Sequence, residues 1–146
     1  MPKRKKFSKQ CKVILDTNVW ISALFWHGIP KQIFTLFTNQ QIKVYFSEST
    51  WKEWQITIGR ISLKLKQEKA FFRLAQLIKK NSHFHSPEIK IDLCRDPKDN
   101  QFLELWVDAR ADFLVSGDQD LLSLKKVKGL KIVTPKQLLD ILNGLE

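Results

Sequence analysis

An apolar run that ends in an acidic residue constrains the fold of this chain more than any other feature. Residues 12–19 read KVILDTNV, so strand-forming side chains come directly before a carboxylate and two small hydrogen-bonding side chains. In an α/β domain, ligands and chemistry collect at the carboxyl ends of parallel strands. A buried strand that ends in Asp16 would therefore present its charge at the edge of the sheet where a metal ion or a phosphate group binds.

Strand-type and helix-type segments alternate along the rest of the chain. Apolar runs predict strands at 12–16, 42–46, 113–116 and 130–133, with a short extended piece at 89–93. Capping residues, prolines and helical spacing predict helices from Pro30, at 47–58, 63–80, from Pro97, at 121–124 and from Pro135. Residues 19–25 continue as a helix start or a loop. This alternation indicates an α/β domain with a parallel sheet covered by helices on both faces.

The length and composition favour one domain behind a basic leader. A chain of 146 residues with 43% hydrophobic content suits a single domain, which we expect over residues 11–146. Residues 1–10 are polar and basic, and they serve equally well as a solubilising tail or as an RNA contact. We see no internal repeat and no second domain.

Charge and cysteine content restrict the setting in which the protein works. No apolar run approaches the ~20 residues of a membrane helix, and Lys12 and Asp16 interrupt the stretch that would follow a signal peptide's basic start. Cys11 and Cys94 have neither metal-site nor disulfide spacing. A reducing cytoplasm is the expected location, and the net charge of +10 favours polyanionic partners.

Four carboxylates stand where function and helix capping look alike. Asp16 and Asp118 each follow an apolar strand, Glu53 lies in the helix after the second strand, and Asp99 opens a helix together with Asp96. A capping side chain contributes only ~1 kcal/mol and occurs in every protein. Each Asp taken singly is therefore better explained as a cap than as a ligand.

Taken together, the acidic residues indicate a metal site. If the strands that precede Asp16 and Asp118 are neighbours, their carboxylates meet at one edge and repel, and a bound cation relieves that repulsion. Carboxylate oxygens suit Mg²⁺ or Mn²⁺, whereas His27, His83 and His85 lack zinc-site spacing. One or two such ions would activate a water molecule and stabilise the charge that builds up at phosphorus.

The order of four motifs resembles the PIN-domain ribonucleases. The matching stretches are DTNV at 16–19, SE at 47–48 with Glu53, RDPKDN at 95–100 and SGDQDLL at 116–122. The resemblance covers residues 11–142 and is closest to the branch of toxins from prokaryotic toxin–antitoxin pairs. Each motif alone is weak, but four in this order and at these distances make a specific pattern.

The resemblance implies a three-layer α/β/α sandwich with a five-stranded parallel sheet, and an endoribonuclease that uses Mg²⁺ or Mn²⁺. It also implies roles for individual side chains in this chain. The implied metal ligands are Asp16, Glu53, Asp99 and Asp118, the accessory acids are Asp96 and Asp120, and the supporting polar side chains are Thr17, Asn18 and Ser116. Trp106 departs from the family, which usually has a small residue there.

The expected partners are RNA and an antitoxin. A basic face formed by Lys66, Lys69, Arg73 and Lys80 is a candidate RNA contact, although such a face is usually only solvated surface. The toxin-like branch implies a small antitoxin that fills the acidic pocket, for instance with an Arg. The aromatic stretch from Trp20 to Trp26 would serve either core packing or docking of an antitoxin or a second copy in a homodimer.

Two other functions compete with the ribonuclease. A non-catalytic PIN-like module would bind RNA or a protein, and it should have lost acidic positions, of which none is missing here. A phosphoryl-transfer enzyme with Asp16 as nucleophile would usually carry a second acidic residue two positions later, where this chain has Asn18. RNA cleavage therefore remains the leading hypothesis.

Overall fold

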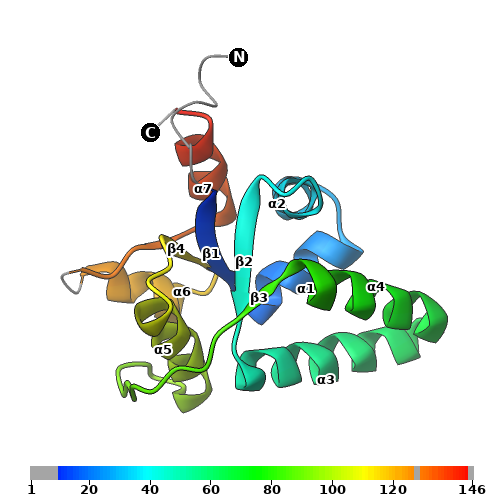
Figure 1. The fold of residues 1–146 in the computed structure, drawn as a ribbon, viewed down its shortest axis with the longest axis horizontal. Helices are drawn as coiled ribbons and strands as arrows, with labels where there is room; N and C mark the ends of the chain where they lie inside the picture. The colour runs from blue at the N-terminus through cyan, green and yellow to red at the C-terminus, as the bar shows by residue number, and fades with distance from the viewer. Residues whose placement is uncertain (1–9, 127–128, 145–146) are drawn as a thin grey trace.

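The protein folds around a five-stranded sheet in which all neighbouring strands are parallel. The structure is a computed structural model and describes residues 10–126 and 129–144, so the predicted leader lies almost wholly outside the described residues. The sheet has the order β3-β2-β1-β4-β5 (Figure 1). Its strands are β1 (Cys11–Leu15), β2 (Ile42–Phe46), β3 (His83–Phe84), β4 (Phe113–Val115) and β5 (Ile132–Val133).

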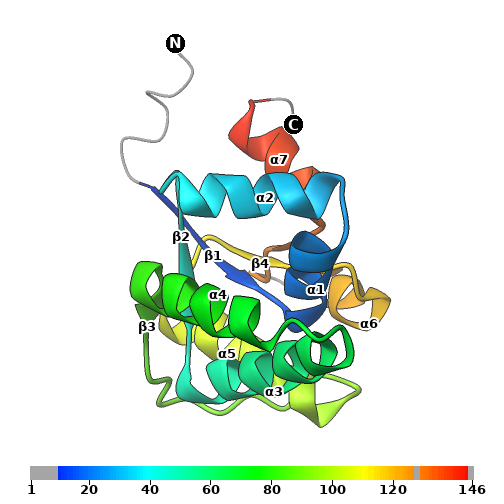
Figure 2. The same ribbon diagram turned by 90° about the vertical axis from the view of Figure 1, so that its right-hand side faces the viewer.

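Helices cover both faces of this sheet and complete the predicted three-layer sandwich. On one side lie α1 (Thr17–Phe25), α2 (Ile29–Thr38), α3 (Glu48–Lys64) and α4 (Glu68–Asn81). On the other side lie α5 (Asn100–Asp108), which packs against β1 and β4, and α6 (Gln119–Leu122) (Figures 1 and 2). The remaining elements are the 3₁₀ turns η2 (Pro97–Asp99) and η3 (Ser123–Lys126) and the last helix, α7 (Pro135–Leu142).

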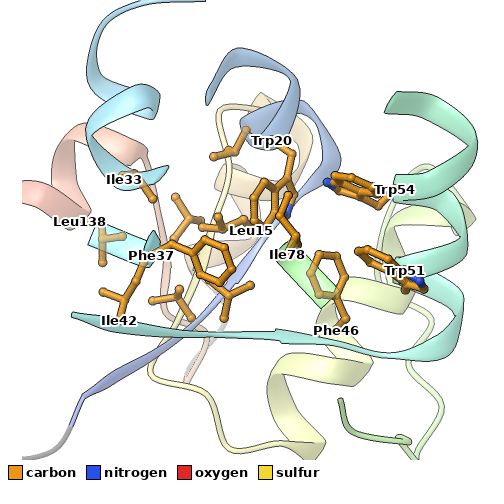
Figure 3. Packing of buried hydrophobic residues seen from close by; sticks show 14 of the residues in the cluster. Leu15, Trp20, Ile33, Phe37, Ile42, Phe46, Trp51, Trp54, Ile78 and Leu138 are labelled. Carbon is orange, nitrogen blue, oxygen red and sulfur yellow. The ribbon is translucent and has the colours of Figure 1, made fainter. Parts of the chain in front are cut away.

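An aromatic cluster fills the space between the sheet and the α1–α4 layer. Trp20 stacks on Phe46 with ring centroids 5.7 Å apart, and Trp51 stacks on Trp54 at 4.8 Å (Figure 3). Trp20 is 1% exposed, so it belongs to the core. Trp26, just after α1, is 66% exposed and is the member of the aromatic stretch that remains available for contact with another molecule.

One strand of the sheet, β3, was not among the strands that the sequence predicted. Residues 83–84 pair with β2, whereas 89–93 form no strand. The backbone of 89–93 is held instead by side chains of α5: Ile91 N donates to Glu104 Oε2 at 3.0 Å, and Leu93 N donates to Asn100 Oδ1 at 3.1 Å. Because these N–H groups are satisfied by side chains, the segment runs beside α5 outside the sheet.

The helix predicted over residues 63–80 is two elements. α3 continues to Lys64, Lys66 takes a positive φ of 56° in the turn, and α4 begins at Glu68. The turn closes with Gln67 N donating to the carbonyl of Ser62 at 2.8 Å. Helical spacing predicts a buried face made of Ala70, Phe71, Leu74, Leu77 and Ile78. Ala70 and Leu77 are exposed, because only the side of α4 that faces α3 and the sheet is covered.

The described helices are short or amphipathic. Among the residues that the structure describes, no helix combines the length and the apolar character needed to cross a membrane.

Candidate active site

Strands β1 and β4 place Asp16 and Ser116 side by side at the carboxyl edge of the sheet. The two strands are parallel neighbours with Leu15 opposite Val115, and Asp16 N donates to the Val115 carbonyl at 3.1 Å. Both polar side chains that follow are buried, with Asp16 4% exposed and Ser116 fully covered. The sequence predicted that the two carboxylates meet if the strands before Asp16 and Asp118 are neighbours. The structure shows that these strands, β1 and β4, are neighbours.

Asp16 caps α1 and also faces the next strand. Its Oδ1 accepts from Val19 N at 2.9 Å, and its Oδ2 accepts a short hydrogen bond from the Ser116 hydroxyl. Ser116 Oγ in turn accepts from Asp118 N at 2.9 Å. This chain of bonds fixes the Asp16 carboxylate, so the capping interpretation is correct for Asp16 and does not exclude a second role.

Glu53 is held from two sides, by residues of other helices. The hydroxyl of Thr17 on α1 donates a short hydrogen bond to Oε2, and Gln101 Nε2 on α5 donates to Oε1 at 3.0 Å. Thr17 thus supports Glu53, while Asn18 is exposed on the first turn of α1. The sequence did not single out Gln101, and its position two residues after Asp99 is the only signal that pointed to it.

The other acids differ in how far capping accounts for them. Asp96 accepts from Lys98 N at 3.1 Å and caps η2, and Asp118 accepts from Asp120 N at 3.0 Å and caps α6. Asp99 occupies the N-cap position of α5 but makes no side-chain cap bond there. Asp120 is exposed and lies 3.9 Å from the Arg95 guanidinium. Capping therefore explains Asp96 and Asp118 but leaves Asp99 without a structural role of that kind.

Asp16, Glu53, Asp99 and Asp118, here called the acidic cluster, act on one another electrostatically. Burial raises the pKa of Asp16 to about 6, with further increases from Asp118 and Glu53 and opposing hydrogen bonds from Ser116 and Val19. Burial also raises the pKa of Asp99 to about 6, and repulsion from Asp118 is the next cause. Like charges thus lie close enough to penalise one another's ionised forms.

The donor chemistry of the acidic cluster fits a hard divalent cation. All its candidate ligand atoms are carboxylate oxygens, which Mg²⁺ and Mn²⁺ prefer. Within residues 10–126 and 129–144, no three His, Cys, Asp or Glu side chains already surround one point as a metal cage. The four carboxylates affect one another electrostatically. That they move together to bind one ion stays a prediction.

The other sequence-predicted contacts lie outside this cluster. Lys66, Lys69, Arg73 and Lys80 are all exposed, with Lys66 in the turn before α4, and their role toward RNA stays a prediction.

A hollow of about 350 Å³ at the far end of α5 contains none of the clustered acids and is lined by Trp106, Val107, Arg110, Ala111, Gly129 and Leu130. Trp106 is 8% exposed and packs in the core beneath α5. The candidate site is therefore identified by its clustered carboxylates, and the hollow lies elsewhere.

The buried charge of Asp16 predicts a stability change on its removal. Between pH 4 and 6 the folded protein keeps a proton on Asp16 that the unfolded chain has lost, so stability falls as the pH rises through this window. The difference between the ordinary pKa of 3.8 for a free Asp side chain and the pKa of about 6 in the folded protein corresponds to about 3 kcal/mol at most. We expect Asp16→Asn to stabilise the metal-free protein by about 1–3 kcal/mol at pH 8, with the advantage vanishing near pH 4.

Thermal unfolding of both proteins in EDTA at the two pH values measures this difference. Asp140→Asn is the matched control, because Asp140 lies on α7 in an ion pair with Lys136. A variant less stable than the wild type at both pH values would show that the charge of Asp16 carries no such penalty.

Comparisons with known proteins identify the family of this chain and agree with its fold. The family model described as PIN domain matches residues 12–120. The uncharacterized protein MJ1680 of Methanocaldococcus jannaschii is 33% identical over 142 residues, covering 88% of this chain and 90% of that protein. The crystal structure of PAE2754 from Pyrobaculum aerophilum is similar in fold, with a TM-score of 0.61 and 13% identity over 92% of this chain and 90% of that one. The chain therefore belongs to the PIN-domain family.

Proposed function

We propose that the acidic cluster binds Mg²⁺ or Mn²⁺ and that the protein is an endoribonuclease that hydrolyses phosphodiester bonds in RNA. The observation that carries this proposal is a group of covered carboxylates that act on one another: burial first, and repulsion between the carboxylates after it, raises the pKa of both Asp16 and Asp99 to about 6. Such repulsion is costly unless a cation offsets it. The net charge of +10 over the whole chain adds long-range attraction for a polyanion.

The side chains of the proposed metal site have different roles. Asp16 and Glu53 are pre-oriented, the first by Ser116 and Val19 N and the second by Thr17 and Gln101. A bound divalent ion would supply Lewis acidity toward a phosphate oxygen and a more acidic water. Asp99 and Asp118 add negative charge on the α5 and α6 sides of the cluster. Asp96, whose charge raises the pKa of Asp99, and Asp120, two residues after Asp118, would be accessory acids.

A toxin role in a toxin–antitoxin pair is the finer form of this proposal. Its support is the motif resemblance, together with an acidic cluster that offers carboxylate partners for an antitoxin Arg. Expression of the chain in a bacterial host should arrest growth, and the Asp16→Asn variant should relieve the arrest. Normal growth of cells that contain the active enzyme would contradict the toxin role and would leave the ribonuclease proposal unaffected.

A homodimer is also proposed, with Trp26 as the residue that would make the contact. Its 66% exposure gives an apolar surface next to the first helix. Sedimentation of the wild type and of Trp26→Ser tests this: a dimer that the substitution weakens supports it, and a monomer at all concentrations contradicts it.

Metal removal gives the direct test of the proposed reaction. Purified protein should cleave single-stranded RNA when Mg²⁺ or Mn²⁺ is present, and excess EDTA should abolish cleavage, because the charge stabilisation at phosphorus is lost. Gel analysis of a labelled RNA before and after adding back each metal measures this. Cleavage that continues in EDTA would contradict the proposal. RNA binding without cleavage in either metal would instead favour a non-catalytic module.

A further inference from the structure

Gln101 connects the start of α5 to the acidic cluster through Glu53. Its amide Nε2 lies 3.0 Å from Glu53 Oε1, and the Thr17 hydroxyl bonds the other oxygen of the same carboxylate. Glu53 therefore has a donor on each oxygen, from α1 on one side and from α5 on the other. Three helices that follow different strands meet at this one side chain.

The chemistry of these groups fixes the direction of the contact. An ionised carboxylate can only accept hydrogen bonds, so the amide group of Gln101 must turn its NH₂ and not its carbonyl toward Glu53. Both donors are neutral, so they leave the negative charge of Glu53 in place. Each carboxylate oxygen also keeps a second lone pair after accepting one bond, and that lone pair remains available to a cation.

Glu53 needs such support more than Asp16 does. Asp16 directly follows a buried strand and is itself 4% exposed, so the backbone already fixes it. Glu53 sits on the second turn of α3, has a longer side chain and is only half-buried. Its position relative to Asp16 and Asp99, whose pKa values it helps to raise, therefore depends on what holds its carboxylate.

We propose that Gln101 is a positioning residue for the metal site, which acts by holding the Glu53 carboxylate toward the acidic cluster. The inference rests on the proposed function, because it assumes that the acidic cluster binds a divalent ion. It adds a residue that none of the sequence motifs assigned. Partners that orient metal ligands typically change metal affinity by 10–100-fold when they are removed.

The test measures Mn²⁺ binding directly, by electron paramagnetic resonance of the free ion, so it does not depend on activity. Gln101→Met keeps the length of the side chain and removes the donor, and Thr17→Val removes the second donor at nearly constant volume. Gln55→Met on the exposed side of α3 is the matched control. Each substitution is also made in a Glu53→Gln background, which completes a double-mutant cycle.

We expect Gln101→Met to weaken Mn²⁺ binding about tenfold, Thr17→Val to act in the same direction, and Gln55→Met to have no effect. In the Glu53→Gln background, Gln101→Met should cause no further loss, because its target is gone. The thermal midpoints of the metal-free variants show that each is folded.

Three results would overturn the inference. If the wild type binds Mn²⁺ and Gln101→Met binds it equally well, Gln101 positions nothing, and the proposed function stands. If Gln101→Met weakens binding equally with and without Glu53, its effect does not pass through that carboxylate. If the wild type binds no Mn²⁺, the proposed function itself is wrong, and the contact between Gln101 and Glu53 is only a link between helices.

Discussion

Substitution of Asp16 by Asn is expected to lower the rate of RNA cleavage by about a thousandfold or more, with the fold intact. Asn has the same shape and still accepts from Val19 N, so the cap of α1 is kept. The loss is the negative charge at the centre of the acidic cluster. Metal-assisted catalysis supplies several kcal/mol of transition-state stabilisation, and each 1.36 kcal/mol is tenfold in rate. Initial rates on a labelled single-stranded RNA at saturating Mg²⁺ measure the effect.

Asp140→Asn is the control for this variant. It also removes one carboxylate, but from α7, which packs beside α2 and β5 and carries no member of the acidic cluster. It should cleave at the wild-type rate. Because both variants are purified by the same procedure, equal activity in all three preparations would reveal a contaminating ribonuclease. An Asp16→Asn protein that is folded and retains more than about a tenth of the wild-type rate would exclude Asp16 as an essential ligand.

Metal affinity is expected to fall steeply below pH 6. Asp16 and Asp99 both have a pKa raised to about 6, chiefly by burial, and a protonated carboxyl does not bind a cation. If both must ionise, acidification from pH 7 to pH 5 reduces the competent fraction, and hence the apparent affinity, by about a hundredfold. A carboxyl with an ordinary pKa near 4 would stay ionised throughout this range.

Mn²⁺ titrations at half-unit steps between pH 5 and 7 measure this dependence. The logarithm of the affinity should rise with a slope between one and two from pH 5 to pH 6 and should level off as the pH approaches 7. Asp16→Asn should reduce the slope by about one, because one of the two titrating groups has been removed. A flat profile in the wild type would mean that neither raised carboxyl takes part in metal binding.

The strands in the middle of the sheet were predictable because a buried strand consists mostly of apolar residues, which can be recognised in the sequence. β1, β2 and β4 are apolar runs, and β1 and β4 are covered on both faces. β3 was missed because its two residues, His83 and Phe84, are exposed and carry no apolar run. Its place is set by pairing with Tyr45 and Phe46 of β2, which is a tertiary contact that local sequence does not encode.

Some features of the candidate site can likewise be read from the local sequence, whereas others depend on contacts between distant residues. The place of Asp16 and Asp118 at one edge of the sheet was predictable, because both follow strands and the carboxyl ends of parallel strands meet there. The contacts of Glu53 were not, because Thr17 and Gln101 lie 36 and 48 residues away from it. The capping question also needed coordinates, since only the structure shows that Asp99 makes no side-chain cap bond while Asp96 and Asp118 each cap a helix.

A Mn²⁺ ion located by anomalous scattering in a soaked crystal tests the central claim most directly. The account predicts one or two ions at the carboxyl edge of the sheet, with oxygens of Asp16 and of at least one of Asp99 and Asp118 at about 2.1 Å, a distance typical of such hard cations. An ion bound at full occupancy elsewhere, with the acidic cluster free of metal and its carboxylates unmoved, would contradict it.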